Sequence, residues 1–173
     1  SSANLLAISS LNLPKRSEVI TPALTFSTTV SPLVQCGLVP AFVDIELSTF
    51  LIDIDLIEEM ITENTKAMLI PNLIGNLPDW EKLRELADQN DLVLIEDSAD
   101  TIGYKYKGGT TEKLSDIVTS SFYASHVITA AGFGGILCTN EEEIAHKATI
   151  GRSWGRASSL REESEDINSR FDA

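Results

Sequence analysis

The residues of this chain best suited to chemistry follow two apolar stretches. Glu96 and Asp97 end the run "DLVLIED", and Asp100 comes three residues after Asp97. His126 follows the run "DIVTSSF", which contains Ser121. A carboxylate at the end of a buried strand needs a partner, because an unpaired buried charge is costly. That partner is either structural, such as a helix N-terminus or an arginine, or a cationic group on a ligand.

His126 is one of two histidines in the chain. A lone histidine is more often structural than catalytic, but this one precedes the glycine-rich bend "GFGG", where backbone can approach a ligand closely. The bend is not a dinucleotide-binding fingerprint, because the required third glycine is missing and no helix opens from it. The other histidine, His146, lies in a polar helical stretch, and we expect it to face solvent.

Two further segments could contact a cofactor. The opening "SSAN" places the hydroxyl and N–H groups of Ser1 and Ser2 at a predicted helix start, which suits a phosphate group. Serine-rich helix starts are common, so this feature alone is weak evidence. Phe26 lies just beyond a predicted strand. An aromatic residue there is usually part of a core, but it could also stack on a flat cofactor ring.

The elements that must position these residues alternate between strand and helix. Apolar runs predict strands at Glu18–Pro22, Val39–Ile45, Lys66–Leu73, Asp91–Asp97, Asp116–Phe122 and Gly134–Asn140, with a hairpin arm at Tyr104–Thr110. Helical spacing predicts helices from Ser1 onward and at Ser27–Cys36, Asp53–Ile61, Leu77–Asn90 and Asn140–Trp154. This order predicts a three-layer α/β/α fold with a mostly parallel sheet. Ligands of such sheets bind at the carboxyl ends of the strands.

Composition excludes several classes of function. The net charge is −13 without a Lys/Arg cluster, which argues against nucleic acid and anionic membrane surfaces as partners. We find no membrane-spanning stretch and no secretion signal, so a cytoplasmic protein is expected. Cys36 and Cys138 share no metal-ligand spacing, and both are predicted to be buried. Both ends look cut, so we expect a fragment of a longer protein.

Several blocks, in order, resemble one known family. The blocks are "SSANLLA", "EVITPALTFSTTV", "GLVPAFVDIE", "LVLIEDSAD", "SDIVTSSFYASH" and "GFGGILCTN". They resemble the large domain of DegT/StrS-type nucleotide-sugar aminotransferases, which are pyridoxal-phosphate enzymes of the aspartate-aminotransferase fold. The resemblance implies that residues 1–156 form the central part of this cofactor-binding domain. Residues 157–173 then form a polar, acidic tail that leads toward a small domain.

The resemblance also implies roles for individual residues. Ser1 and Ser2 match the phosphate-holding turn, and Ser121 matches a phosphate-binding hydroxyl. Phe26 matches the aromatic side chain that stacks on the pyridine ring. Asp97 matches the carboxylate that pairs with the ring nitrogen and lets the ring accept electrons.

Two positions depart from the common family pattern. Asp100 matches the residue beside the ring hydroxyl, where most aminotransferases of the family carry Gln. His126 matches the position of the lysine that anchors the cofactor covalently. An imidazole cannot form that bond, but it can move a proton near neutral pH. The histidine resembles the 3-dehydratase branch of the family, which uses pyridoxamine phosphate on 4-keto-6-deoxy nucleotide sugars.

We therefore expect a C3 dehydration in deoxysugar biosynthesis for surface polysaccharide such as lipopolysaccharide, with His126 as the base. One subgroup adds an iron–sulfur cluster through cysteines after a "WGR" segment. The segment Ser153–Phe171 has no Cys, so no cluster is expected there. The family also implies an amino donor such as glutamate and a homodimer. Two alternatives stay open, which are a pyridoxal-phosphate-dependent sugar aminotransferase and a non-catalytic sugar-nucleotide-binding homologue.

Overall fold

The computed structural model describes residues 1–111, 113–126 and 128–157. The predicted acidic tail at 157–173 therefore lies, apart from its first residue, outside the described part of the chain. None of the helices described is long and apolar enough to cross a membrane.

Within the described residues, six strands form one sheet in the order β2-β1-β3-β4-β5-β6. Their bounds are β1 (Glu18–Pro22), β2 (Val39–Val43), β3 (Thr65–Pro71), β4 (Val93–Asp97), β5 (Ile117–Ser121) and β6 (Gly135–Thr139). Strands β1 to β5 pair in parallel, and β6 pairs antiparallel with β5 at one edge. The sheet is thus mostly parallel, as the alternating sequence pattern predicts.

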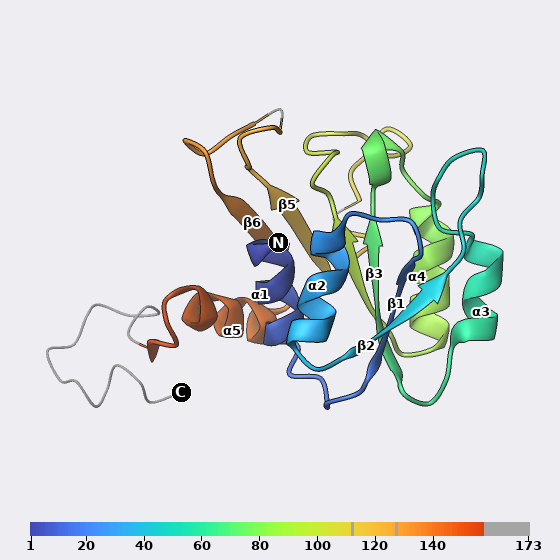
Figure 1. The fold of residues 1–173 in the computed structure, drawn as a ribbon, viewed down its shortest axis with the longest axis horizontal. Helices are drawn as coiled ribbons and strands as arrows, with labels where there is room; N and C mark the ends of the chain where they lie inside the picture. The colour runs from blue at the N-terminus through green and yellow to red at the C-terminus, as the bar shows by residue number, and fades with distance from the viewer. Residues whose placement is uncertain (112, 127, 158–173) are drawn as a thin grey trace, which may run out of the picture.

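The helices and short 3₁₀ turns are α1 (Ser2–Ser10), α2 (Ser27–Gln35), η1 (Ile54–Leu56), α3 (Ile57–Met60), η2 (Leu73–Gly75), α4 (Trp80–Gln89) and α5 (Glu142–Arg152). Helix α1 precedes β1, α5 follows β6, and the other helices and short 3₁₀ turns lie between strands in the chain (Figure 1). Helix α4 illustrates how the local sequence specifies a helix. The Asp79 side chain accepts a hydrogen bond from the Lys82 N–H at the helix start, and Trp80, Leu83 and Ala87 form its buried face.

Each face of the sheet has its own apolar core, because successive residues of a strand point to opposite faces. Val19 packs with Ile8 of α1 and Leu33 of α2. Its neighbour Ile20 packs on the other face, with Trp80 of α4. Helices therefore cover both faces, which confirms the predicted three-layer α/β/α arrangement. Helices α1 and α2 lie side by side on the first of these faces.

Three local expectations differ from the structure. The segment at Tyr104–Thr110 forms a single bridge between Tyr106 and Gly109 rather than a hairpin arm. Helix α5 begins at Glu142 with Glu141 as its N-cap, two residues later than the predicted start at Asn140. Cys138 is exposed and Cys36 is half-buried. The prediction of buried cysteines fails most clearly at Cys138, since β6 is an edge strand covered by fewer neighbours.

Candidate functional site

The carboxyl ends of the parallel strands meet the first turn of α1. The contact is direct, because Asn4 Nδ2 of α1 donates a hydrogen bond of 2.7 Å to Asp97 Oδ2 at the end of β4. Strand order places β1, which leads to Phe26, and β5, which ends at Ser121, on either side of β3 and β4. The residues predicted from sequence therefore come from elements that converge on one edge of the sheet.

Asp97 has a well-defined set of hydrogen bonds. It is 7% exposed, and its Oδ2 accepts from Asn4 and, at 2.9 Å, from Thr29 Oγ1 of α2. Its Oδ1 accepts from the Ala99 N–H at 3.3 Å. Two short bonds thus occupy Oδ2, whereas Oδ1 has a single long one. Oδ1 keeps capacity for a further donor, such as a cationic N–H group of a ligand.

Asn4 and Thr29 contact Asp97 in the candidate site, and the sequence analysis missed both. Their partners lie 93 and 68 residues away in sequence. A local signal does exist for Asn4, since it shares the buried face of α1 with Ala7 and Ile8. A polar residue on an otherwise apolar helix face needs a hydrogen-bond partner elsewhere in the fold.

Phe26 presents its ring to solvent. It is the N-cap residue of α2, and it is 70% exposed. A phenyl ring that is not part of the core is free to stack on a flat ligand. The structure therefore disfavours the alternative that Phe26 is a core residue.

The serines lie around a close approach between α1 and the β5–β6 hairpin. Gly135 pairs with Ser121, and a Cβ at Gly135 would lie 3.3 Å from the Ala3 Cβ and 3.1 Å from the Ser120 carbonyl oxygen. Only glycine allows this approach without a shift of its neighbours. Through it, the end of β5 comes next to the helix start that carries Ser1 and Ser2. Their side chains are exposed, so hydroxyl and helix N–H groups are available to an anion.

His126 lies beside the turn that follows Asp97. Its Nδ1 is 3.9 Å from Asp100 Oδ1, and its ring meets the Tyr123 ring edge-on at a centroid distance of 6.4 Å. Asp100 is itself oriented by the Ile74 N–H, which donates to Oδ2 at 3.1 Å. Nδ1 is thus the ring nitrogen that lies on the side of the Asp100 carboxylate. His146 is exposed on α5, as expected.

A second polar network lies on the other face of β4 and fixes the same turn. Asn72 Nδ2 donates to Glu96 Oε1 at 2.7 Å and to Thr101 Oγ1 at 2.8 Å, and Trp80 Nε1 donates to Asn72 Oδ1 at 3.0 Å. Burial raises the pKa of Glu96 above its ordinary range, although hydrogen bonds, including that from Asn72, oppose the rise. This network fixes the turn at residues 97–101 from the α4 face of the sheet.

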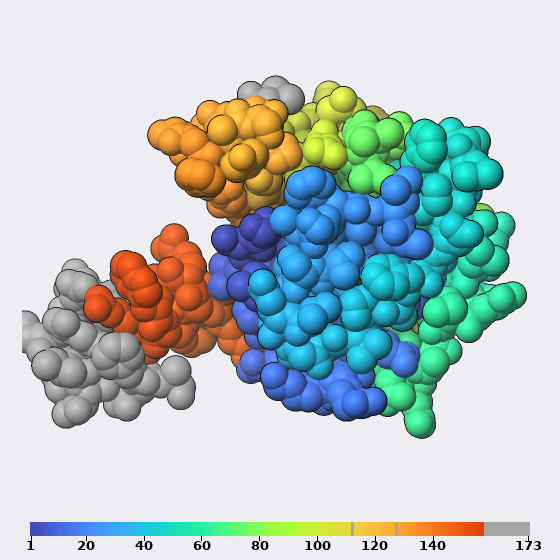
Figure 2. Space-filling view, viewed as in Figure 1, coloured from blue at the N-terminus to red at the C-terminus, as the bar shows by residue number. Residues whose placement is uncertain are grey.

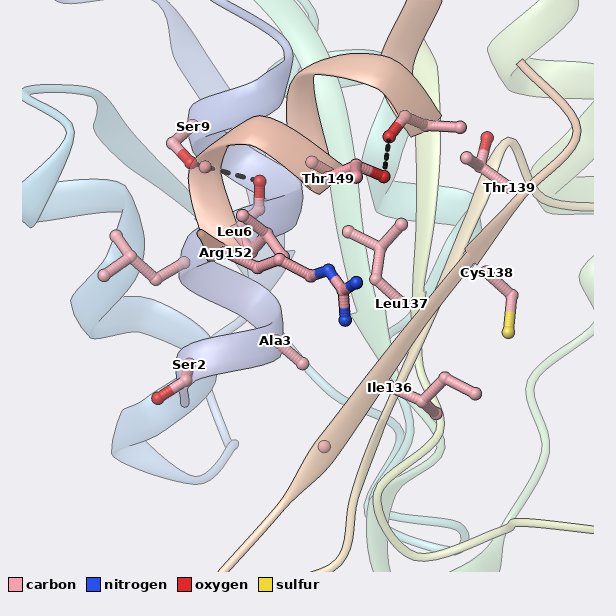
Figure 3. A pocket seen from close by; sticks show the side chains of 15 residues that line it. Ser2, Ala3, Leu6, Ser9, Ile136, Leu137, Cys138, Thr139, Thr149 and Arg152 are labelled. Atoms are coloured by element: carbon pink, nitrogen blue, oxygen red, sulfur yellow. Dashed lines mark hydrogen bonds between the residues drawn. The ribbon is translucent and has the colours of Figure 1, made fainter. Parts of the chain in front are cut away.

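A groove of about 940 Å³ lies between α1, β6 and α5, outside this cluster. Figure 2 shows the hollow between the projecting β5–β6 hairpin and α5, and Figure 3 shows the Arg152 side chain extending into it. Of the seven predicted site residues, Ser2 alone lines the groove. The groove therefore adjoins the helix start without containing Asp97 or His126.

Taken together, the side chains fit one kind of ligand. A buried carboxylate suits a cationic ring nitrogen, an exposed phenyl ring suits a flat ring, and the serines with the α1 N-terminus suit a phosphate. In the described residues, no cluster of His, Cys, Asp and Glu could hold a metal ion. The donor set thus matches a flat, phosphorylated heterocycle such as pyridoxal phosphate or pyridoxamine phosphate.

Comparison with known proteins also indicates a cofactor of the pyridoxal-phosphate type. A dTDP-4-dehydro-2,6-dideoxy-D-glucose 3-dehydratase of Saccharopolyspora spinosa is 43% identical over 164 residues, which are 90% of this chain and 35% of that protein. A solved GDP-4-keto-6-deoxymannose-3-dehydratase with a trapped PLP–glutamate geminal diamine is also similar. It has a TM-score of 0.88 and 32% identity, over 98% of this chain and 47% of that one.

A variant of the same dehydratase, in which an adjacent serine and histidine are replaced by asparagine and lysine, also superposes with a TM-score of 0.88. It is 32% identical, over 98% of this chain and 48% of that one. The chain thus spans between a third and a half of the length of these proteins. The sequence profile of the DegT/DnrJ/EryC1/StrS aminotransferase family matches residues 1–172. By this match and by its fold, the chain belongs to the DegT/DnrJ/EryC1/StrS aminotransferase family.

Proposed function

We propose that this chain is the central part of the cofactor-binding domain of an enzyme that removes the C3 hydroxyl of a nucleotide-linked 4-keto-6-deoxy sugar. The cofactor is pyridoxamine or pyridoxal phosphate, without an iron–sulfur cluster. The observation that carries the proposal is His126, an imidazole beside the turn that bears Asp97 and Asp100. The two dehydratases described above, at 43% and 32% identity, support this choice of reaction.

Each site residue then has a defined task. Asp97 pairs with the ring nitrogen, Phe26 stacks on the ring, and Ser1, Ser2 and Ser121 bind the phosphate. When bound, the cofactor supplies an amine that condenses with the sugar ketone and a ring that accepts electrons. The reaction also needs a group that moves a proton.

That group is His126, which moves a proton at Nε2. Asp100 faces Nδ1 and orients the imidazole, with its own carboxylate positioned by the Ile74 N–H. The serine and histidine replaced in the solved dehydratase variant are adjacent, as Ser125 and His126 are here. This identical order supports the assignment of His126 to the catalytic position.

The partners follow from the same proposal. The substrate is a nucleotide sugar, and glutamate serves as the amino donor that recharges the cofactor. A bound PLP–glutamate adduct in the solved relative supports glutamate. The intact protein acts as a cytoplasmic homodimer, and its product enters the synthesis of surface polysaccharide. A net charge of −13 supports the absence of nucleic acid from the list of partners.

Replacement of His126 tests the assignment. In the intact protein, His126→Asn should lower the rate of 3-deoxy-sugar formation by about 100-fold or more, because general-base catalysis contributes at least that factor. The variant should still bind the cofactor, as measured by absorbance. The matched control is His146→Asn, the same substitution at an exposed position of α5, which should keep the rate within about twofold of the wild type.

Product analysis separates the alternatives. An amino sugar formed from the keto sugar and glutamate would identify an aminotransferase. Cofactor binding without any sugar product would identify a binding homologue. Unchanged dehydration by His126→Asn would remove His126 from the mechanism while leaving the reaction in place.

A further inference from the structure

Asn4 connects the elements that carry the proposed cofactor contacts. It lies in the first turn of α1 beside Ser1 and Ser2, and its Nδ2 donates to Asp97 of β4. The same Nδ2 approaches the Thr28 carbonyl oxygen of α2 at 3.4 Å, in the turn that follows Phe26. Its Oδ1 accepts from Thr119 of β5. One side chain thus contacts α1, α2, β4 and β5.

The orientation of the Asn4 amide is fixed by its partners. Thr119 Oγ1 donates to Oδ1 at 2.5 Å, and Asp97 Oδ2 accepts from Nδ2 at 2.7 Å. A carboxylate only accepts hydrogen bonds, so the amide nitrogen must face Asp97. A rotation of the amide by half a turn would place Oδ1 against the carboxylate and lose the bond to Asp97, whereas the Thr119 hydroxyl can either donate or accept.

The surroundings of Asn4 show why a polar residue stands there. Asn4 is 4% exposed and shares its helix face with apolar Ala7 and Ile8. Burying an amide costs free energy unless its hydrogen bonds are made. The compensating contact with the largest energetic weight is that to the Asp97 carboxylate, because bonds to charged groups are about twice as strong as neutral ones.

Thr29 completes the arrangement from the neighbouring helix. Its Oγ1 donates to the same oxygen, Asp97 Oδ2, at 2.9 Å. Thr29 also lies in the first turn of α2, and its backbone N–H donates to the carbonyl oxygen of Phe26 at 2.9 Å. The two donors occupy Oδ2, so Oδ1, with its single longer bond from the Ala99 N–H, is the oxygen that keeps capacity for a ligand.

We propose that Asn4, together with Thr29, is a positioning residue that fixes Asp97 so that Oδ1 receives the cationic nitrogen of the cofactor ring. This inference rests on the proposed function, since it assumes a pyridine-type cofactor at Asp97. It assigns to Asn4 a second effect. The amide links the phosphate-binding turn to the ring-binding carboxylate. The residues that bind the two ends of the cofactor are therefore joined by the hydrogen bonds of Asn4.

Binding of pyridoxamine phosphate to the intact protein tests this inference without any turnover. Asn4→Leu and Thr29→Val each remove one donor to Oδ2 at nearly constant volume. Each should raise the dissociation constant about tenfold, as expected for one lost bond to a charged group. Each should also shift the absorption maximum of the bound cofactor, which reports the protonation of its ring.

Ser10→Ala is the matched control. Ser10 is a buried polar residue of the same helix, and its Oγ donates only to the Ala7 carbonyl oxygen of that helix, at 2.8 Å. This variant should lower thermal stability without a change in the cofactor spectrum or affinity. A merely structural role for Asn4 predicts the same pattern for Asn4→Leu.

The outcomes separate this inference from the proposed function. Wild-type affinity and spectrum in Thr29→Val and in folded Asn4→Leu would overturn the positioning role while the proposed function stands. If Asn4→Leu does not fold, Thr29→Val decides. A wild-type protein that binds no pyridoxamine phosphate would overturn both.

Discussion

Two adjacent carboxyl groups at the end of β4 have opposite surroundings. Glu96 is 2% exposed and faces the α4 side, where Asn72 contacts it and burial raises its pKa. Asp97 is 7% exposed and faces α1 and α2, where Asn4 and Thr29 donate to a single oxygen. One strand end thus separates a buried structural network around Glu96 from the candidate cofactor-binding carboxylate of Asp97.

The difference follows from the geometry of a strand. Side chains of consecutive residues alternate between the two faces, so Glu96 and Asp97 cannot share a network. On the α4 face Glu96 is enclosed, Asn72 donates to its Oε1, and the network stabilises the turn. On the α1/α2 face one carboxylate oxygen keeps capacity for a ligand. We therefore expect stability to depend on the first face and function on the second.

The largest expected effect is on the α4 face. Trp80 is fully buried and donates to Asn72, so Trp80→Ala should lower the free energy of unfolding by about 3–5 kcal/mol. The control is Trp154→Ala at a residue that is 83% exposed, with an expected change within about 0.5 kcal/mol. Urea unfolding measures both. Equal losses for the two variants would contradict the assignment of Trp80 to the core network.

Replacement of Asp97 addresses the other face. Asp97→Asn keeps the shape but removes the charge, so turnover should fall by about 100-fold or more, because electrostatic stabilisation at the reacting group is lost. Glu96→Gln is the matched variant on the opposite face, and turnover should fall less than in Asp97→Asn, because glutamine keeps an oxygen that accepts from Asn72. Both rates come from product formation by the intact protein. A larger loss in Glu96→Gln than in Asp97→Asn would reverse the comparison.

Phe26 should affect cofactor binding with little effect on stability. Its ring is 70% exposed, so Phe26→Ala removes little core packing. Loss of stacking should weaken pyridoxamine phosphate binding by a factor of roughly two to ten. Phe42→Ala on β2, at a residue that is 48% exposed, should leave the affinity unchanged. An absorbance titration compares the two variants, and equal affinities would exclude stacking by Phe26.

The smallest effect is a pH dependence of stability. The pKa of Glu96 is raised in the folded protein, so folding retains a proton that the unfolded chain releases. Its stabilising contribution is complete below the unfolded-state pKa and declines as the pH rises through the folded-state pKa. Glu96→Gln cannot titrate. The melting temperature of the variant minus that of the wild type should therefore increase from pH 4 to pH 8, and a constant difference would contradict the pKa shift.

Local sequence signals predicted much of the fold. Strand β1 has the predicted bounds Glu18–Pro22, because an apolar run between turn residues specifies a buried strand. Helix α4 lies within the predicted range Leu77–Asn90. The bridge at Tyr106 and the cap of α5 were predicted less well, because short polar segments depend on neighbours that the local pattern does not reveal.

The residues of the candidate site also fall into those that the sequence predicted and those that it did not. The family resemblance named Asp97, Phe26 and His126, and the strand order brings their elements to one edge. The residues that orient Asp97 were missed, since Asn4 and Thr29 reach it across 93 and 68 residues. Hydrogen bonds between distant segments leave only an indirect trace in sequence, here a polar residue on a buried helix face.

The central claim is that an imidazole at residue 126 replaces the covalent anchor of the cofactor. The most direct test is the absorbance spectrum of the intact protein with pyridoxal phosphate before and after borohydride, followed by intact-mass measurement. We predict a bound cofactor that dialysis removes after reduction, with no phosphopyridoxyl group attached to the chain. A stoichiometric phosphopyridoxyl adduct on a single lysine would contradict the claim.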